Sequence, residues 1–399
     1  MYTERITQKQ PGGRVAQDLP ETAQLVVIGG GVIGTSIAFH LAEAGMHDVL
    51  LLERDGLGEG STAKAAGGVR GQFADATNIA LAAHSLAAFE LFPRRPGQEI
   101  DLHQVGYLFL LSRHEDVTEF EKAIALQNEL GVPSRLISVD QAVRMSPLVR
   151  DDGLLAAAFS PSDGHCAPES VVQGYARGAR RQGARLVTRC AVRAVNVEDG
   201  RITSVETDQG LVGTSTIVCA AGAWSATVGK MAGLELPVSP LRRQIVVTEP
   251  VPDLPEHLPM TIDFTTSFYF HKEGPGLLIG MSDPDERPGF DVRPTDGWLP
   301  RLSEAIEHRA PRLSGVGIVT GWAGLYEQTP DHNALIGESV ELPGFFYATG
   351  FSGHGFLQGP AIGEVMRDLI LGREPFVDVR PLSVDRFAND QARPERYII

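Results

Sequence analysis

An apolar run, a glycine-rich turn and a second apolar run stand in the order of a β-α-β unit. Residues 25–28 read Leu-Val-Val-Ile, and residues 29–34 read Gly-Gly-Gly-Val-Ile-Gly. Apolar residues at helical spacing predict a helix over 35–44, and the run 49–52 predicts the next strand. Because neither apolar run alternates with polar residues, both strands are expected to be buried on both faces.

Periodicity divides the rest of the chain into a part of mixed helices and strands and a strand-rich part. Further helices are predicted over 76–91, 115–130, 168–179, 298–310 and 360–371, and further strands over 102–112, 153–159, 185–188, 191–197, 244–248, 260–264, 268–271, 277–280 and 316–323. The close succession of strands between 242 and 281 predicts a separate antiparallel sheet. The apolar run at 216–219 ends in Ala-Ala-Gly and begins a helix, so we expect it to return to the first sheet.

These patterns predict an α/β fold with two discontinuous domains. A nucleotide-binding domain is expected over 24–95, 150–235 and 325–380, and a substrate-binding domain over 96–149 and 236–324. Such an insertion of one domain into another places a ligand cleft between them. Residues 1–23 are polar and lack the apolar core of a secretory signal, so we expect a flexible lead-in.

Composition and charge argue against several classes of partner. The chain has 399 residues, of which 43% are hydrophobic, and no apolar stretch reaches the about 20 residues of a membrane span. Its formal net charge of −15 argues against binding to nucleic acid or to an anionic membrane surface. The cysteines at 166, 190 and 219 show no metal-binding spacing, which favours buried, reduced thiols in a cytoplasmic protein. Whether the chain forms a homo-oligomer stays open.

The glycine turn is suited to a dinucleotide. Gly29 allows a tight turn, Gly31 lets the backbone approach a pyrophosphate, and Gly34 lets the helix pack on the strand. The first N–H groups of that helix, near Val32 and Ile33, offer the phosphates hydrogen bonds and a partial positive charge.

The acid after the second strand indicates an unphosphorylated ribose. Glu53 can accept hydrogen bonds from both ribose hydroxyls, and its charge would repel a 2′-phosphate. A stretch of glycine and other small residues follows over 56–70, and such residues let a chain lie flat against a ligand. These features leave NAD and FAD open.

Four motifs beyond the glycine turn carry a family resemblance. They read Gly-Ser-Thr at 60–62, Ala-Ala-Gly-Ala-Trp-Ser at 220–225, Tyr-Glu-Gln-Thr-Pro-Asp at 326–331 and Gly-Phe-Ser-Gly-His-Gly-Phe at 350–356. With them the chain resembles the FAD-dependent amine and amino-acid oxidoreductases of the D-amino-acid oxidase superfamily, which include glycine and sarcosine oxidases. The resemblance implies FAD, a Rossmann-like FAD-binding domain of the GR2 type, and a second α+β substrate domain built on an antiparallel sheet.

The residues that the resemblance assigns to FAD lie in or near these motifs. Besides Gly29, Gly31, Gly34 and Glu53 they are Val32, Ile33, Arg54, Ser61, Thr62, Lys64, Ala66, Gly67, Gly68, Val192, Ala221, Gly222, Trp224, Gly324, Tyr326, Gly353, His354, Gly355, Phe356 and Leu357. The helix after 350–356 is expected to point its N-terminus at the flavin. Some relatives tether FAD through a His in the stretch where this chain has Lys64. Others tether it through a Cys just ahead of the 326–331 motif, where this chain has Gly324 and Leu325. A non-covalent FAD is therefore expected.

The usual anchors for a substrate carboxylate are missing. Leu357 stands where simple sarcosine oxidases carry a Lys, and Tyr326 where glycine oxidases carry an Arg. Arg70 and Arg243 are the candidate anchors, because a guanidinium can bind a carboxylate with two hydrogen bonds. A structural role stays open for each of them.

The remaining catalytic candidates are aromatic. Tyr269, Tyr326 and His354 are expected near the substrate, and His271 could line the same cleft. Apolar residues in the strand-rich part, such as Phe268 and Met281, suggest a cavity with an apolar arm, although packing in the sheet is the alternative for all of them.

The resemblance implies an FAD-dependent oxidase of a secondary or N-substituted amino acid, with O2 as acceptor and H2O2 as product. Leu278 stands where simple sarcosine oxidases carry an oxygen-activating Lys, and Lys64 or Lys272 could take its place. The alternative is a flavin subunit of a heteromeric amino-acid dehydrogenase that passes electrons to a partner protein.

Overall fold

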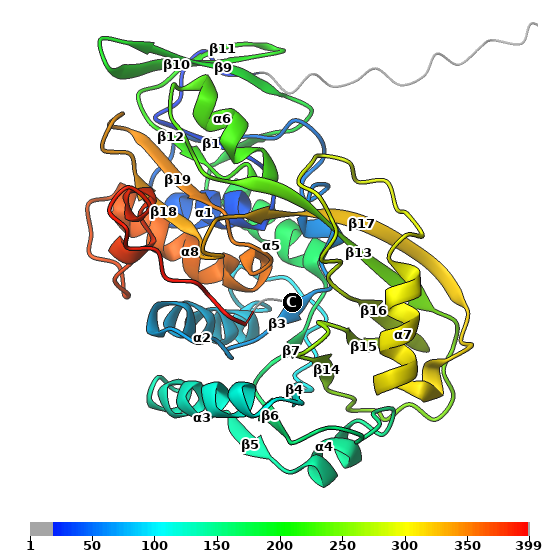
Figure 1. Cartoon of the computed structure of the whole chain (residues 1–399). Coiled ribbons are helices and arrows are strands. Elements are labelled where there is room, and N and C mark those ends of the chain that lie inside the picture. The colour runs from blue at the N-terminus through cyan, green and yellow to red at the C-terminus, as the bar shows by residue number, and fades with distance from the viewer. Residues whose placement is uncertain (1–18, 398–399) are drawn as a thin grey trace, which may run out of the picture.

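The first apolar run forms the central strand of a six-stranded sheet in the computed structural model, which describes residues 19–397 (Figure 1). Strand β1 (Leu25–Ile28) lies between β2 (Val49–Leu52) and β12 (Ile217–Cys219), and both pairings are parallel. β8 (Arg185–Val187) pairs with β2, β19 (Phe345–Thr349) pairs with β12, and antiparallel β18 (Leu335–Glu338) lies at the edge. All residues of β1, β2 and β12 are buried, which explains their unbroken apolar sequences.

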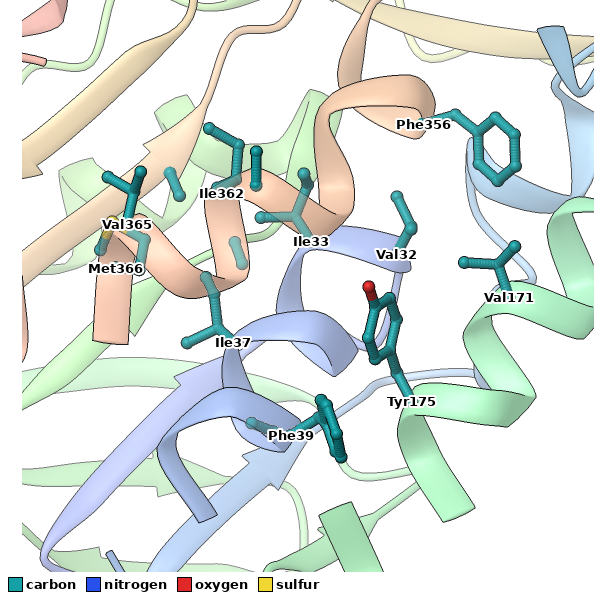
Figure 2. Packing of buried hydrophobic residues seen from close by; sticks show 14 of the residues in the cluster. Val32, Ile33, Ile37, Phe39, Val171, Tyr175, Phe356, Ile362, Val365 and Met366 are labelled. Carbon is teal, nitrogen blue, oxygen red and sulfur yellow. The ribbon is translucent and has the colours of Figure 1, made fainter. Parts of the chain in front are cut away.

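Helices cover one face of this sheet. They are α1 (Val32–Glu43), α2 (Ala76–Leu91), α5 (Pro168–Arg181) and α8 (Gly355–Ile370). Figure 2 shows α1 packed between α5 and α8, with Ile37 and Tyr175 in a shared apolar cluster. Leu25 and Val27 of β1 belong to this cluster. Their neighbours Val26 and Ile28 point to the opposite face.

The opposite face is covered by a three-stranded meander and a short helix. The meander consists of β9 (Val192–Glu198), β10 (Arg201–Thr207) and β11 (Gly210–Gly213), and the helix is α6 (Ser225–Met231). Both pack on the apolar residues that β1 and β12 present on that side. The first sheet is therefore buried on both faces.

The second sheet has eight strands. Their order is β17 (Ile318–Gln328), β13 (Ser239–Thr248), β16 (Gly276–Gly280), β15 (Tyr269–Glu273), β14 (Met260–Asp263), β4 (Tyr107–Leu111), β6 (Ala156–Ser160) and β5 (Arg135–Ile137). α7 (Leu299–Arg309) and α4 (Val139–Met145) pack on one face, and α3 (His114–Glu129) on the other. β4 and β14 run parallel, so the sheet is mixed and not wholly antiparallel as the sequence predicted.

A two-stranded ladder and five short 3-10 helices complete the described structure. β3 (Gly68–Val69) pairs with β7 (Gly164–His165), and the short 3-10 helices are η1 (Thr62–Lys64), η2 (Gly222–Trp224), η3 (Pro311–Leu313), η4 (Arg380–Leu382) and η5 (Val384–Arg386). The segment after η5, as far as residue 397, runs toward β3, as Figure 1 shows.

Most predicted elements are present, and several boundaries differ, three of them near the cavity or between the two sheets. The helix predicted from 360 begins at Gly355, with Pro360 inside it, because the left-handed Gly353 (φ 101°) ends the preceding turn earlier. β6 pairs with β4 and β5, so the second sheet takes a strand from residues that we expected in the nucleotide-binding domain. β17 continues past residue 324 to Gln328 in the same sheet.

The predicted lead-in falls mostly outside the described residues. Residues 1–18 are not described, whereas Ala23 donates its N–H to the Gly213 carbonyl and Gly213 donates to Glu21, so this end of the segment is held on β11. Within residues 19–397, no helix combines the length and the apolarity that a membrane crossing needs.

Candidate active site

A cavity of about 400 Å³ lies between the two sheets. Its floor is formed by the carboxyl ends of β1, β2 and β12. From β1 the chain continues to β2 on one side, and the later strand β12 joins the sheet on the other side of β1. Ligands of open α/β sheets bind at this kind of switch point. The opposite end of the cavity is formed by β4, β13, β14, β15 and β17 of the second sheet.

The glycine turn shapes the floor of the cavity. Gly29 has φ 117°, and a Cβ there would lie 2.3 Å from the Ala220 carbonyl oxygen. A Cβ on Gly34 would lie 1.9 Å from the Gly29 oxygen, so Gly34 packs α1 onto the turn and does not itself line the cavity. The Val32 N–H donates to the Thr62 hydroxyl (3.1 Å) at the start of α1. The N-terminus of α1 thus opens into the cavity, ready for a pyrophosphate.

Glu53 lies where a ribose-binding acid is expected. Its carboxylate accepts hydrogen bonds from the N–H groups of Gly30 (2.6 Å) and Asp55 (2.8 Å). Burial raises the pKa of Glu53, while these two bonds oppose the shift. A carboxylate has about four acceptor positions, so two remain for ligand hydroxyls. Arg54 stacks on Trp224, with 3.7 Å from its Cζ to the ring centroid, at the same end of the cavity.

Replacing Glu53 by alanine should weaken FAD retention. Loss of charged hydrogen bonds to the ribose costs about 1.5–3 kcal/mol, or roughly ten- to 150-fold in Kd. Flavin remaining after gel filtration, measured from the visible absorbance, checks this. A variant that elutes with as much FAD as the parent protein contradicts the ribose role.

The other residues assigned to FAD also lie on the cavity wall. All of them except Gly34 line it, from Val192 and Trp224 at one end through 66–68 to Gly353–Leu357. At Gly353 a Cβ would lie 2.5 Å from the Tyr326 ring, so glycine keeps this turn flat against Tyr326. The N-terminus of α8 begins two residues later and opens into the cavity. The residues present therefore fit an FAD. Glu53 would bind the ribose, the N-terminus of α1 the pyrophosphate, and the small residues at 66–68 and the N-terminus of α8 would lie along the rest of the cofactor.

Arg243 lies at the second-sheet end of the cavity with spare hydrogen-bonding capacity. Its Nη1 donates to the Arg242 carbonyl (3.1 Å), and its Cζ lies 5.1 Å from the Tyr326 ring centroid. Its Nε is buried and has no partner in the described part of the chain. A buried, unsatisfied charged donor is costly, so this guanidinium is suited to receive an anionic ligand group.

The wall around Arg243 is aromatic and apolar. Tyr107, Tyr269, Met260 and Ile245 line it, and burial raises the pKa of both tyrosines, which therefore stay neutral. This end of the cavity can exclude water around a small substrate.

Arg70 also lines the cavity, but both of its terminal nitrogens already donate to main-chain carbonyls. Its Nη2 donates to the Tyr397 carbonyl (2.6 Å) and lies 3.2 Å from His354 Nε2, and its Nη1 donates to the Gln72 carbonyl. The guanidinium also lies over the Phe73 ring at 4.2 Å. Burial, and the charge of Arg70, hold the pKa of His354 well below its usual range, so this histidine is neutral.

Several residues considered for the substrate side lie elsewhere. His271 contacts the carbonyls of Ala66 (Nε2, 3.0 Å) and Lys272 (Nδ1, 2.9 Å) and does not line the cavity. Arg242 forms an ion pair with Glu286 (2.9 Å). The side chains of Phe264, Phe268, Phe270, Leu278 and Met281 pack in the cores of the second sheet. The apolar arm of the cavity therefore comes from Met260 and Ile245.

Sequence reasoning missed Tyr107, Met260 and Glu327. The first two face the cavity because β4 and β14 pair, which no local pattern reveals. Glu327 lines the cavity and accepts hydrogen bonds from Thr349 Oγ1 (2.8 Å) and Gly350 N (3.0 Å), while burial raises its pKa to about 7. An acid inside the motif 326–331 was a visible signal for it. The three cysteines are buried and free, and the described residues contain no group suited to hold a metal ion.

Comparison with known proteins agrees with this geometry. The family model described as FAD dependent oxidoreductase (DAO) matches residues 24–369. The crystal structure of L-proline dehydrogenase from P. horikoshii superposes with a TM-score of 0.88 at 34% identity, covering 94% of this chain and all of that one. Glycine oxidase from Geobacillus kaustophilus superposes with a TM-score of 0.81 at 28% identity, covering 92% and 99% of the two chains.

A longer relative matches over part of its length. Mitochondrial dimethylglycine dehydrogenase from Rattus norvegicus is 33% identical over 92% of this chain, which spans only 45% of that protein. The match over 24–369, the superposition and the cavity together show that the chain belongs to the DAO family of FAD-dependent oxidoreductases.

Proposed function

We propose that the protein oxidises an amino acid at the C–N bond of a secondary or N-substituted amine, with non-covalent FAD. The substrates we infer are of the glycine, sarcosine or N-alkylglycine type. The observation that carries this proposal is the guanidinium of Arg243, whose buried Nε has no partner in the described residues, at the aromatic end of the cavity.

The chain's residues bind and orient the substrate. Arg243 holds the carboxylate, and Tyr107, Tyr269 and Met260 exclude water around the amine, which favours its neutral form. FAD supplies the acceptor for the hydride that leaves the carbon next to the amine, and the imine product then hydrolyses. The N-terminus of α8 stabilises negative charge on this side of the cavity.

A non-covalent FAD is supported by the residues at the tethering positions. Gly324 and Leu325 carry no nucleophile, and a Cβ on Gly324 would lie 2.5 Å from Lys64 Cβ, so the wall leaves no room for a cysteine there. Acid precipitation should release the flavin into the supernatant. Yellow colour retained in the washed pellet would contradict the proposal.

The relatives support an amino acid with a substituted nitrogen. The names of two of them specify proline and dimethylglycine, which carry secondary and tertiary amines. The glycine oxidase shows that the same fold also accepts a primary amine. The test is anaerobic mixing of the purified protein with sarcosine, glycine, proline and N-alkylglycines. Loss of the visible flavin absorbance identifies substrates, and no loss with any of them refutes the assignment.

For the electron acceptor we propose O2, with H2O2 as product, and one observation favours a second candidate. The family resemblance puts Leu278 at the place of the oxygen-activating lysine. Leu278 is buried in the sheet, and Lys272 does not line the cavity, although Lys64 does. A dehydrogenase that passes electrons to a partner protein fits this arrangement. Oxygen consumption by the purified chain in the presence of its substrate decides: rapid consumption supports the oxidase, and turnover only with an artificial dye supports the dehydrogenase.

A further inference from the structure

The C-terminal segment contacts Arg70, a residue of the active-site wall, from behind the cavity. Residues 393–397, here called the C-terminal strap, run from the 331–333 turn to a position beside β3, as the red trace in Figure 1 shows. Glu395 donates its N–H to the Asp331 carbonyl (3.0 Å), and Arg393 accepts a hydrogen bond from Asn333. The strap thus crosses the molecule within reach of the cavity.

Two buried side chains fasten the strap. Glu395 is 3% exposed, and its Oε1 accepts the N–H groups of Arg396 (3.0 Å) and Tyr397 (2.9 Å), while Asn78 donates to its Oε2 (3.3 Å). The Tyr397 ring is 2% exposed and stacks on Phe120 of α3 with a centroid distance of 4.3 Å and an angle of 8°.

The fastened strap engages Arg70. The Tyr397 carbonyl accepts a hydrogen bond from Arg70 Nη2 (2.6 Å), which is shorter than the contact of Nη2 with His354 (3.2 Å). The main chain of Tyr397 is also a hydrogen-bond partner of His354. A substrate carboxylate that approached Arg70 would have to displace this carbonyl. The two arginines of the cavity therefore differ. The buried Nε of Arg243 has no partner in the described residues, whereas Arg70 already donates to the strap from one terminal nitrogen and to Gln72 from the other.

We propose that the C-terminal strap withholds Arg70 from the substrate and so makes the cavity selective for amines that carry a single carboxylate. The proposal rests on the function proposed above, because it takes Arg243 as the carboxylate anchor. Release of the strap would free Arg70 Nη2 from the Tyr397 carbonyl, and a second carboxylate on the ligand would then gain a partner on the cavity wall.

A matched pair of ligands tests this specificity. (Methylthio)acetate and thiodiacetate differ by one carboxylate and contain no amine to oxidise, and their binding is measured from the perturbation of the flavin spectrum. The parent protein should prefer (methylthio)acetate. In Tyr397→Ala, and more strongly in the double variant Glu395→Ala/Tyr397→Ala, the affinity for thiodiacetate relative to (methylthio)acetate should rise about tenfold or more.

Controls separate the strap from charge and from folding. Arg396→Ala removes an exposed strap residue paired with Glu119, and it should leave the affinity ratio unchanged. Tyr397→Ala changes no charge, so its effect cannot come from the removal of an acid. If both Tyr397 variants fail to fold, hydrogen exchange of the parent protein tests the role of the strap instead. Thiodiacetate should speed exchange of the backbone amides of residues 395 and 397, and (methylthio)acetate should not.

The outcomes distinguish the two proposals. An unchanged ratio in a folded Tyr397→Ala variant, or identical amide exchange with both ligands, overturns the role of the strap while the proposed function stands. If neither ligand perturbs the flavin of the parent protein, the carboxylate site itself is wrong, and the strap proposal falls with it.

Discussion

Replacing Arg243 by alanine is expected to raise the KM for an amino-acid substrate by roughly ten- to 150-fold, equivalent to about 1.5–3 kcal/mol of lost binding. The Arg243 Nε has no protein partner in the described residues, whereas Arg70 already donates to the Gln72 and Tyr397 carbonyls and is poorly placed to take over the carboxylate. Because the carboxylate is held in both ground state and transition state, kcat should change less than KM.

Arg242→Ala is the matched control for this prediction. Arg242 precedes Arg243 on β13, but its side chain pairs with Glu286 outside the cavity. Its loss should leave KM close to that of the parent protein. Equal KM values for Arg243→Ala and the parent would remove Arg243 from the site.

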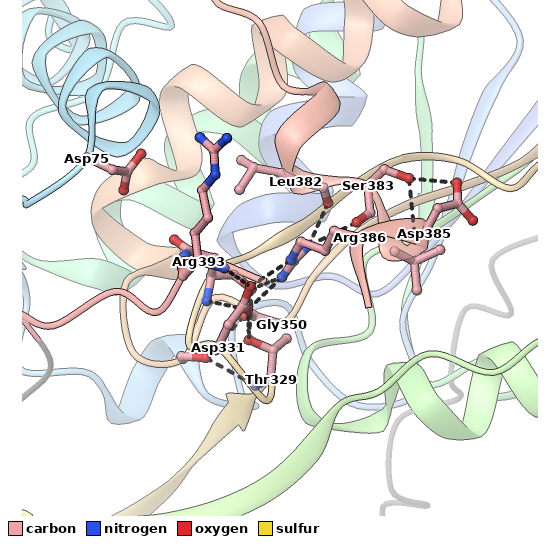
Figure 3. A network of polar contacts seen from close by, with 12 residues as sticks. Asp75, Thr329, Asp331, Gly350, Leu382, Ser383, Asp385, Arg386 and Arg393 are labelled. Carbon is pink, nitrogen blue, oxygen red and sulfur yellow. Dashed lines mark hydrogen bonds and ion pairs between the residues drawn. The ribbon is translucent and has the colours of Figure 1, made fainter. Parts of the chain in front are cut away.

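Replacing Arg386 by alanine is expected to lower the free energy of unfolding by about 3–5 kcal/mol, because it leaves a buried carboxylate without its cation. Figure 3 shows Arg386 against Asp331, the last residue of the 326–331 motif. The guanidinium binds the carboxylate through Nε and Nη2 (both 2.8 Å), and the two side chains are 3% and 2% exposed. Arg386 also donates to the Leu382 and Asn333 carbonyls, so one side chain holds η4 and η5 onto the 331–333 turn.

Urea unfolding compared with Arg380→Ala tests this stability prediction. Arg380 lies six residues earlier and pairs with Asp378, but its side chain is 90% exposed, so its removal should leave the unfolding midpoint close to that of the parent protein. Similar unfolding midpoints for the two variants would show that the buried pair does not hold the C-terminal region in place.

Local sequence was sufficient for the nucleotide-binding half of the site. The turn at Gly29, the helix after it and the acid Glu53 follow one another within thirty residues, and their geometry depends on backbone conformations that glycine alone adopts easily. The start of α8 was misjudged because Pro360 resembles a first-turn proline, whereas here it lies inside the helix.

Tertiary contacts decide the substrate half, and sequence could not supply them. Arg70 and Arg243 were equivalent candidates as residue types, and only their partners separate them: the Tyr397 carbonyl binds one, and the Nε of the other is left without a partner in the described chain. Tyr107 reaches the cavity through the parallel pairing of β4 with β14, which joins segments about 150 residues apart in the sequence.

The measurement that tests the account most directly is a single anaerobic turnover with two amines of similar size. Sarcosine carries the carboxylate that Arg243 should bind, and N-methylpropylamine replaces it with an ethyl group. The account predicts that sarcosine or another N-substituted amino acid bleaches the flavin with one aldehyde or oxo acid formed per FAD, and that the amine without a carboxylate does so far more slowly. Equal bleaching by both amines, or an unchanged flavin spectrum with every amino acid tried, would contradict it.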